Sequence, residues 1–509
     1  MKKRLFAFTL IFAFAISGCN KGTPSNTSKT QPRTTTSIST SENSDVSASS
    51  SVQITSSSIQ STSKSSSSGG IKSSSIDPAS PYFKKDLTVK MDAGLSEAKN
   101  KASYDLSFRY DDELFIGNAK TYNKDLSLVS FAASIATATK ERCNQFFNES
   151  GFKDITPHGY EEEPTKDSMG YFLAHKSIDD FELVAISFRG FNYGMEWANN
   201  FLVGKKDNHE GFNLRGLEAY QELTKYIANH AKDKTLKLWI NGYSRAGALS
   251  NVLASLILKY QLVNVISENM FVYTFEAPAS LSEENAVAYE NVHNIINEVD
   301  LVAAIPPTTY GLKRCGVDHQ IFDNNFAELL HQFDENINVP EFVKVTSTNE
   351  PLTTDLDVKK YALNSVFNKE EVETISEDVY ANTREQYVNN YQAGLSESLG
   401  YLFALGTDTL LSLIDDLKEL GTGALTIVAD QTGLELMNFL KPYLDKDHVE
   451  YDETSLQENC ATLVKGIQNL FASVLLMYLS EEYKGNLTRL IDMHFPETTY
   501  VLLVNDFYR

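Results

Sequence analysis

Ser244 stands in the stretch NGYSRAGA, which joins an apolar, strand-like run to a helix-like run. A sharp strand-to-helix turn can hold a serine hydroxyl out as a nucleophile if the residues two before and two after it are small. Gly242 and Ala246 meet this requirement. The turn also places the backbone N–H of Arg245 at the start of the helix, where it can stabilise an oxyanion. An ordinary Gly-x-Ser turn is the alternative, but the flanking strand and helix favour the nucleophile.

A serine hydroxyl is a weak nucleophile until a histidine takes its proton and a carboxylate orients that histidine. Asp300 closes the apolar run VHNIINEVD, where an active-site loop should begin. It is our candidate for the acid, and an ordinary strand-ending aspartate is the alternative. Where the serine lies on such a turn, the expected chain order is serine, acid, histidine.

The chain has nine histidines, and the expected order separates those that precede Asp300 from those that follow it. Five precede Asp300 and are expected to be structural: His158, His175, His209, His230 and His293. For His209, we expect a role in holding the turn at Gly211-Phe212.

Four histidines follow Asp300 and remain candidates for the base: His319, His331, His448 and His494. His319 lies in a stretch with the pattern of a hairpin strand, while His331 and His448 lie in a polar helical region where a solvated face is expected. His494 ends a helical run and precedes Phe-Pro, which favours a loop at that point. We therefore predict His494 as the general base, with His319 as the alternative.

Strand-like and helix-like stretches alternate between residues 125 and 300. The strand-like stretches are 169–176, 181–188, 237–241, 270–278 and 292–300, and the helix-like ones are 125–147, 214–231 and 246–260. This alternation predicts an α/β fold with a mostly parallel sheet and helices on both faces. Sites in such sheets form at the carboxyl ends of the strands. Long amphipathic stretches predict a mainly helical insertion over 325–487, which could cap the site.

Six stretches in order resemble the class 3 lipases, an α/β-hydrolase family. They are FRGFNYGMEW (188–197), NHEGF (208–212), GYSRAGA (242–248), VYTFEAPAS (272–280), NEVDLVAAIPP (297–307) and IDMHFPETTY (491–500). The resemblance covers roughly residues 100–322 and 488–505. It implies Ser244 as nucleophile, Asp300 as orienting acid and His494 as base, acting on glycerides or phospholipids.

The same resemblance implies the backbone N–H of Phe191 as the second oxyanion donor, beside that of Arg245. The family often has a small hydroxylated residue where Phe191 stands, so only a main-chain donor is expected here. A second departure is Ala246, which replaces the usual glycine. We expect Arg189 and Trp197 to fix the turn that carries Phe191.

The N-terminus has the features of a targeting segment. MKKR is followed by an apolar run over 5–16 and by Ser-Gly-Cys, which resembles the lipobox of bacterial lipoproteins. We therefore expect residues 1–18 to be a signal peptide and Cys19 to be lipidated. Residues 19–80 are rich in Ser and Thr and should form a disordered tether. This arrangement places the protein at the extracellular face of the bacterial membrane.

The rest of the composition excludes several classes. A formal net charge of −22 makes nucleic acid a poor partner. Cys143, Cys315 and Cys460 are too few and too widely spaced for a disulfide framework or a zinc site. We find no glycine-rich phosphate loop and no HExxH motif, so no cofactor and no metal is expected.

The expected organisation has an α/β-hydrolase core over 81–324, the insertion over 325–487 and a C-terminal core segment over 488–509 that carries His494. The expected function is a cell-surface serine hydrolase that cleaves carboxylic esters through an acyl-enzyme. An acyltransferase or another acyl hydrolase on the same triad is one alternative. A surface binding protein that retains the fold without catalysis is the other.

Overall fold

The fold is taken from a computed structural model of the chain. It describes residues 82–92, 103–160, 164–165, 167–191, 194–231, 234–261, 265–297, 300, 302–321, 383–405, 409, 412–413, 429–470 and 494–507. The expected signal peptide, Cys19 and the tether lie outside the described residues, as does His331.

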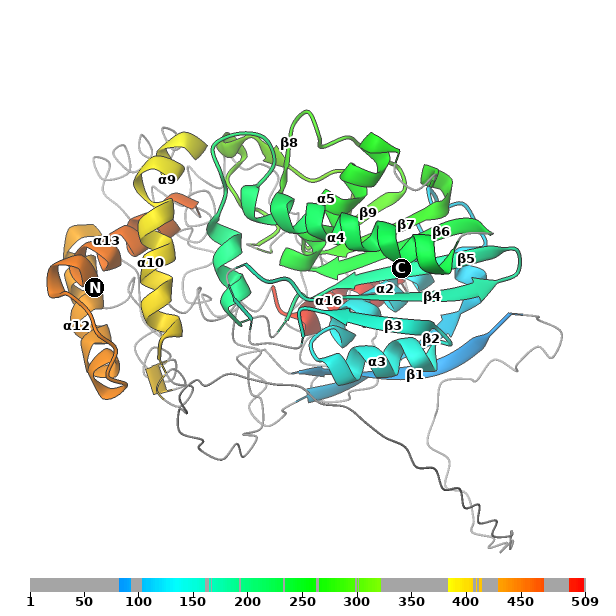
Figure 1. The fold of residues 1–509 in the computed structure, drawn as a ribbon, viewed down its shortest axis with the longest axis horizontal. Coiled ribbons are helices and arrows are strands. Elements are labelled where there is room, and N and C mark those ends of the chain that lie inside the picture. The colour runs from blue at the N-terminus through cyan, green and yellow to red at the C-terminus, as the bar shows by residue number, and fades with distance from the viewer. Residues whose placement is uncertain are drawn as a thin grey trace, which may run out of the picture. The chain divides into compact units, whose positions relative to one another are not determined.

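A seven-stranded sheet forms the centre of the molecule (Figure 1). In spatial order its strands are β11 (Val317–Gln320), β9 (Val292–Ile296), β7 (Met270–Phe275), β6 (Thr235–Tyr243), β5 (Phe181–Phe188), β4 (Tyr171–Ile178) and β3 (Lys153–His158). In this order, each strand from β11 to β5 runs parallel to the next one. The β5–β4 and β4–β3 pairs are antiparallel. The predicted α/β fold with a mostly parallel sheet is therefore confirmed.

The strands are apolar on both faces because helices cover both. All eight residues of β5 are buried. Along β6, Trp239 belongs to one apolar cluster, while Leu238 and Ile240 belong to a second cluster on the opposite face. Alternate side chains of a strand point to opposite faces, so a continuous apolar run is what a doubly covered strand requires.

Two groups of helices make up these layers. The helices α4 (Glu210–His230) and α5 (Arg245–Tyr260) contribute to the second cluster, whereas α2 (Lys124–Ala136), α3 (Lys140–Glu149) and α16 (Pro496–Phe507) contribute to the first. The helix-like stretch over 125–147 forms two helices, α2 and α3, and not one. The helix breaks after Ala136, and the Thr139 side chain caps α3 by accepting a hydrogen bond from the Arg142 N–H at 3.2 Å.

Two further pairings also depart from the prediction. The antiparallel strands β1 (Lys84–Asp92) and β2 (Ser103–Asp111) were not predicted, although their buried residues alternate regularly. The stretch 312–320, predicted as a hairpin strand, instead forms β10 (Leu312–Lys313) and β11. The first pairs with β8 (Leu281–Ser282), and the second runs parallel to β9.

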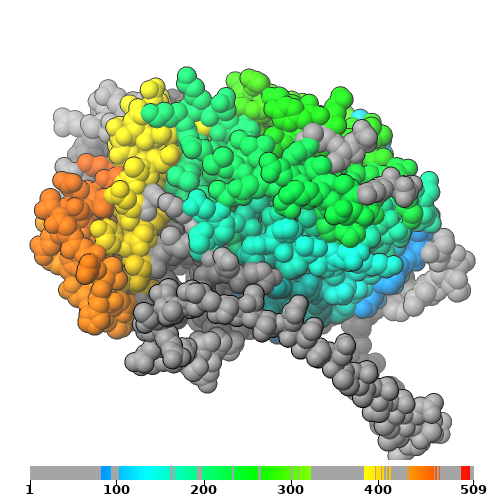
Figure 2. Space-filling view, viewed as in Figure 1, coloured from blue at the N-terminus to red at the C-terminus, as the bar shows by residue number. Residues whose placement is uncertain are grey.

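The elements that the structure describes between residues 325 and 487 are helices: α9 (Arg384–Asn390), α10 (Gln392–Phe403), α12 (Ala429–Lys446) and α13 (Glu453–Leu470). Helices α9 and α10, yellow in Figures 1 and 2, adjoin the core, and α10 contacts η2 (Gly194–Phe201). His448 is exposed after α12, as expected. In the described part of the chain, none of the helices has the length and apolarity needed to cross a membrane.

Candidate active site

Ser244 lies between the end of β6 and the first residue of α5, in a backbone conformation that only a constrained turn maintains. Its φ is +57° and its ψ is −126°. A β-carbon on Gly242 would lie 2.3 Å from the carbonyl oxygen of Ala246, and one on Gly247 would lie 2.8 Å from the β-carbon of Ala277. Side chains are therefore excluded at both glycines, and the predicted strand–turn–helix around Ser244 is present.

Two hydrogen bonds connect Ser244, His494 and Asp300. His494 Nε2 lies 2.8 Å from Ser244 Oγ, and His494 Nδ1 lies 2.7 Å from Asp300 Oδ2. The three residues come from separate segments: the β6–α5 turn, the loop after β9 and the residue two before α16. Ser244 is 4% exposed and Asp300 is 1% exposed. The structure thus brings together the three residues that the sequence predicts, in the order needed for proton transfer from serine to histidine.

Neighbouring groups hold both partners of Ser244. The other carboxylate oxygen of Asp300 accepts a hydrogen bond from the Val302 N–H at 2.8 Å. The Tyr243 hydroxyl donates to the carbonyl oxygen of His494 at 2.7 Å. Burial lowers the pKa of His494 to about 4, and the neighbouring carboxyl group of Glu276 opposes this shift. Burial therefore favours the neutral imidazole, the form that can accept the proton of Ser244.

Glu276 was missed by the sequence analysis. It is the first residue after β7, it is 0% exposed, and its carboxyl group is hydrogen-bonded to Asp300. Its oxygens also accept hydrogen bonds from the Asn297 N–H at 2.9 Å and from Thr499 Oγ1 at 3.0 Å. A sequence signal existed, because a glutamate directly after a buried strand occupies the sheet edge where sites form.

The predicted oxyanion turn lies against the predicted nucleophile. A β-carbon on Gly190 would lie 2.4 Å from the carbonyl oxygen of Tyr243, so this position must be glycine. The ring of Phe191 stacks on that of Tyr243 with 4.9 Å between centroids. The backbone of Phe191 is thus held next to the turn that carries Ser244 and Arg245.

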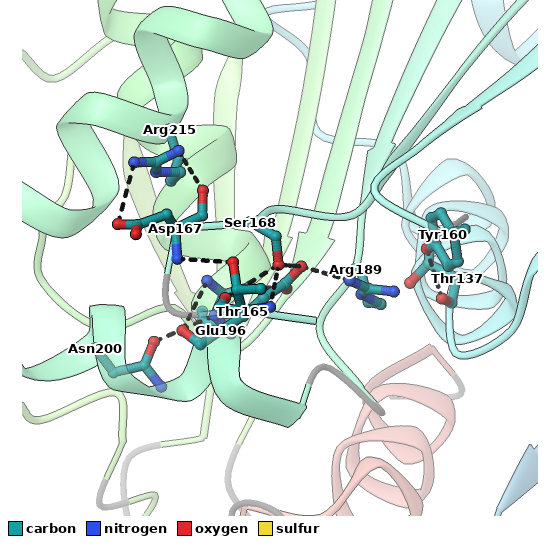
Figure 3. Close-up of polar contacts among 10 residues, drawn as sticks. Thr137, Tyr160, Thr165, Asp167, Ser168, Arg189, Glu196, Asn200 and Arg215 are labelled. Carbon is teal, nitrogen blue, oxygen red and sulfur yellow. Dashed lines mark hydrogen bonds and ion pairs between the residues drawn. The ribbon is translucent and has the colours of Figure 1, made fainter. Parts of the chain in front are cut away.

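A buried ionic network joins these two turns (Figure 3). Glu196, 0% exposed, accepts hydrogen bonds from the guanidinium groups of Arg189 and Arg245, the latter at 2.9 Å. Ser168 donates a further bond to Glu196 at 3.1 Å. Arg189 also lies 4.5 Å from the ring centre of Tyr160, on the opposite side from Glu196. The expectation that Arg189 fixes its turn is confirmed.

A cavity opens beside Ser244, and most of its lining is apolar. Its volume is about 30 Å³, far less than the several hundred Å³ of typical ligand pockets. The larger apolar side chains that line it are Phe201, Val203, Phe212, Val302, Ile305 and Leu470. Leu470 is the last residue of α13, so the helical insertion contributes to this cavity.

The other described histidines contact structural partners. His209, directly before α4, lies with Nε2 3.1 Å from the carbonyl oxygen of Asn200, and Gly211 and Phe212 belong to the first turn of α4. His293 and His319 face each other, with 3.1 Å between Nδ1 and Nε2. Neither belongs to the hydrogen-bonded set at Ser244.

Among the described residues, one group has ligand atoms close enough together to hold a metal ion: Asp154, His175 and His230. It comes from β3, β4 and the end of α4 and includes no residue of the set at Ser244. Both ring nitrogens of His175 are within hydrogen-bonding distance of carboxylates, Nδ1 with Glu182 at 2.5 Å and Nε2 with Asp154 at 2.7 Å. Hydrogen bonds between His175 and the two carboxyl groups account for this geometry without a metal.

The segment from β5 to the turn after β9 decides the relationship to known proteins. Residues 185–310 match the sequence model of the class 3 lipases. Class 3 lipases are carboxylic ester hydrolases, and the match assigns this activity to the segment that holds Ser244 and Asp300. His494 lies outside it.

Several solved lipase structures resemble the chain at low identity. One is a triacylglycerol lipase with a serine protease triad at its catalytic centre; it is 18% identical, with 40% of this chain and 83% of that one covered and a TM-score of 0.32. The triacylglyceride lipase of Rhizomucor miehei is 17% identical, with 40% of this chain and 83% of that one covered and a TM-score of 0.30. The mono- and diacylglycerol lipase of Aspergillus oryzae is 15% identical, with 40% of this chain and 81% of that one covered and a TM-score of 0.29. No curated protein sequence matches the chain.

Proposed function

We propose that this protein is an α/β-hydrolase-type serine hydrolase that cleaves carboxylic esters, with lipids as the substrate class. The observation that carries the proposal is the pair of hydrogen bonds from His494 to Ser244 and Asp300, at 2.8 and 2.7 Å. These bonds form across residues that are far apart in the chain, so they require the tertiary fold. The match to class 3 lipases supports the same reaction class.

In the proposed reaction, Ser244 Oγ attacks the ester carbonyl while its proton passes to His494 Nε2. The carbonyl oxygen becomes an oxyanion, which the backbone N–H groups of Phe191 and Arg245 stabilise. His494 then gives the proton to the departing alkoxide, which leaves as the alcohol. Water attacks the acyl-enzyme and loses its proton to His494. The bond between the acyl carbon and Ser244 Oγ then breaks, His494 returns the proton to Ser244 Oγ, and the carboxylic acid is released. Asp300 orients the imidazole and stabilises the imidazolium.

The cavity beside Ser244 is the proposed acyl site. Its larger lining side chains are apolar, which suits a fatty acyl chain and disfavours a charged one. At about 30 Å³ it is too small for such a chain, so substrate entry requires lining residues to move apart. Leu470 comes from α13, whereas the other five large apolar residues come from the core. We propose displacement of α13 as the opening step.

We also propose that residues 1–18 direct export and that a lipid on Cys19 holds the protein at the extracellular face of the membrane. Residues 19–80 would then act as the tether between lipid and enzyme. The supporting observation is the Ser-Gly-Cys sequence after an apolar run. Metabolic labelling with a radioactive fatty acid should mark the wild-type protein and not the Cys19→Ala variant.

A fluorophosphonate probe tests the proposed reaction directly. The purified protein should be labelled at Ser244, and the Ser244→Ala and His494→Ala variants should not be labelled although they fold. Ester hydrolysis should fall at least 10³-fold in both variants. Product analysis with a competing alcohol separates hydrolysis from acyl transfer. A folded wild-type protein that neither reacts with the probe nor hydrolyses esters would point to the binding protein instead.

A further inference from the structure

We propose that Glu276 is a positioning residue of this site: it keeps a proton, donates it in a hydrogen bond to Asp300, and so leaves one negative charge facing His494. This inference rests on the proposed function. Neither the match to class 3 lipases nor the sequence analysis assigns a role to Glu276.

The contacts of Glu276 reach all the segments that carry the partners of Ser244. Its carboxyl group bonds Asp300 in the loop after β9, and it accepts from the Asn297 N–H at the start of the same loop. Thr499 donates to it from α16, the helix that begins two residues after His494. One buried carboxyl group therefore ties the acid loop to the element that holds the base.

The backbone at Glu276 is in a conformation that a large side chain rarely adopts. Its φ is +49°, in the left-handed region that favours glycine. Such a conformation costs on the order of 1 kcal/mol and persists where the surroundings require it. At this position the main chain still continues the sheet, since the Glu276 N–H donates to the carbonyl oxygen of Ile295 at 3.0 Å. The strain is therefore associated with a side chain that is wholly buried against Asp300.

Two carboxyl groups that share a hydrogen bond in a dry site cannot both be ionised at neutral pH. Burial raises the pKa of Asp300 as well, but Asp300 is the better stabilised anion of the two, because the N–H groups of Val302 and Ala303 donate to it and the charge of Arg314 lies nearby. The carboxyl group of Glu276 accepts hydrogen bonds from only one backbone N–H, that of Asn297, and one hydroxyl, that of Thr499, among the described residues. The proton therefore belongs on Glu276. Burial, and then the charge of Asp300, raise the pKa of Glu276 well above its usual value.

The remaining titratable groups around Glu276 are consistent with this assignment. They are His494 and Tyr243, with Glu497 near Tyr243 and Arg314 near Asp300. Burial raises the pKa of Tyr243 well above its usual value, so this phenol stays neutral and donates to the His494 carbonyl. When His494 becomes an imidazolium during the reaction, the one negative charge of the carboxyl pair balances it. At high pH, Glu276 loses its proton. The two adjacent carboxylates then repel each other, and Asp300 is displaced.

The test compares ester hydrolysis by the full chain from pH 5 to 10 in the wild type and in two variants at position 276. Glu276→Gln keeps a donor for Asp300 and cannot ionise, whereas Glu276→Ala leaves Asp300 and the Asn297 N–H without this partner. Glu182→Gln is the matched control, because it alters another buried glutamate whose described hydrogen bonds are to His175 and Ser177. Far-UV circular dichroism and melting establish that each variant folds.

We expect wild-type kcat/KM to fall at alkaline pH and this fall to be absent in Glu276→Gln, which keeps at least a third of wild-type kcat/KM at pH 7. Glu276→Ala should lose at least tenfold at pH 7, and Glu182→Gln should keep the wild-type profile. The inference is overturned if folded Glu276→Gln loses 100-fold at pH 7, which would mean that an ionised Glu276 is required. It is also overturned if Glu276→Gln keeps the alkaline fall, or if the wild type has none.

A stability measurement separates failure of this inference from failure of the proposed function. A folded-state pKa raised above the unfolded value contributes stability that is present at low pH and is lost as pH rises through the folded value. The melting temperature of the wild type should therefore fall relative to Glu276→Gln as the pH is raised from about 4.5, the ordinary pKa of glutamate, towards the raised pKa of the folded state. This difference is measurable even if the protein hydrolyses no ester, and its absence would show that Glu276 does not hold the proton.

Discussion

Ser244 can adopt its strained backbone conformation because the neighbouring Gly242 has no side chain. Gly242 has no β-carbon, and one placed there would lie 2.3 Å from the Ala246 carbonyl oxygen and 2.8 Å from Ser250 Oγ. The backbone atoms cannot move away without unwinding the first turn of α5. The position of the nucleophile therefore depends on the absence of side-chain atoms as much as on any contact.

The Gly242→Ala variant should lose at least about 3 kcal/mol of unfolding free energy, because the added methyl group overlaps backbone rather than a flexible side chain. Ester hydrolysis should fall more than about 100-fold, since a small displacement of the nucleophile is enough. Chemical denaturation and ester kinetics measure the two effects. Gly117→Ala is the control, because nothing lies within 4 Å of that β-carbon position, and its change should stay within about 0.5 kcal/mol.

The pKa of His494 predicts two effects of acid. Burial lowers it to about 4, from the ordinary value of 6.5. The acidic fall of kcat/KM should therefore lie below pH 6.5, because the imidazole stays neutral as a base. A depressed folded-state pKa also means that the unfolded chain binds the proton first, so stability is complete above pH 6.5 and decreases toward pH 4, by up to about 3 kcal/mol.

Denaturation of the wild type and of His494→Asn between pH 4 and 8 measures this linkage. The stability difference between the two proteins should change with pH in favour of the variant as the pH falls below 6.5. Parallel stability curves in this range would show that His494 titrates normally.

At the scale of elements, Arg384 of α9 is one of the residues that join the described helices of the insertion to the core. Arg384, 8% exposed, donates hydrogen bonds to five backbone carbonyl groups of a single loop, those of Val203, Gly204, Lys206, Asp207 and Asn208. Val203 also lines the cavity beside Ser244. Helix α9 is thus attached to a wall of the cavity, while Leu470, the last residue of α13, forms another part of the lining.

The Arg384→Ala variant should lose about 3 kcal/mol, because buried carbonyl groups lose a charged donor that Lys cannot replace at all five positions. Hydrogen exchange should increase in α9, in α10 and in residues 203–208, with smaller changes in β5 and β6. Lys441→Ala is the control, since it removes a surface ion pair with Glu453 and should cost less than about 1 kcal/mol. An unchanged exchange pattern in Arg384→Ala would show that the insertion is held elsewhere.

Across the whole molecule, stability comes from apolar burial on both faces of the sheet rather than from covalent links. Cys143, Cys315 and Cys460 are all buried and free. Burial raises the pKa of Cys143 well above its usual value and those of Cys315 and Cys460 to about 12. Such thiols lack both the ionisation and the access that reactivity requires.

The native Cys19→Ala chain should therefore react with Ellman's reagent at none of these three cysteines, and all three should react after denaturation. A reductant should not change its melting temperature. One rapidly reacting thiol in the native chain would contradict the burial described here.

Where a feature depends on neighbours in the chain, the sequence alone was enough to predict it. The turn at Ser244 requires small residues within three positions, and the runs that became β5, β6 and α5 carry their apolar pattern in consecutive residues. Asp300 and His494 were found because the chemistry of a serine nucleophile asks for both and the chain order restricts the choice. The break after Ala136 was missed because the apolar spacing continues across it, although Thr139 is a common capping residue.

Features that depend on distant partners were decided only by the tertiary structure. The 312–320 stretch pairs with β8 and β9 rather than with itself, because those strands offer buried edges that a local hairpin lacks. Glu276 is separated by 223 positions from the Thr499 hydroxyl that bonds it and by 24 from Asp300 (300 − 276). Its ionisation depends on burial and on a second carboxyl group, and neither exists until the sheet, the loop after β9 and α16 have come together.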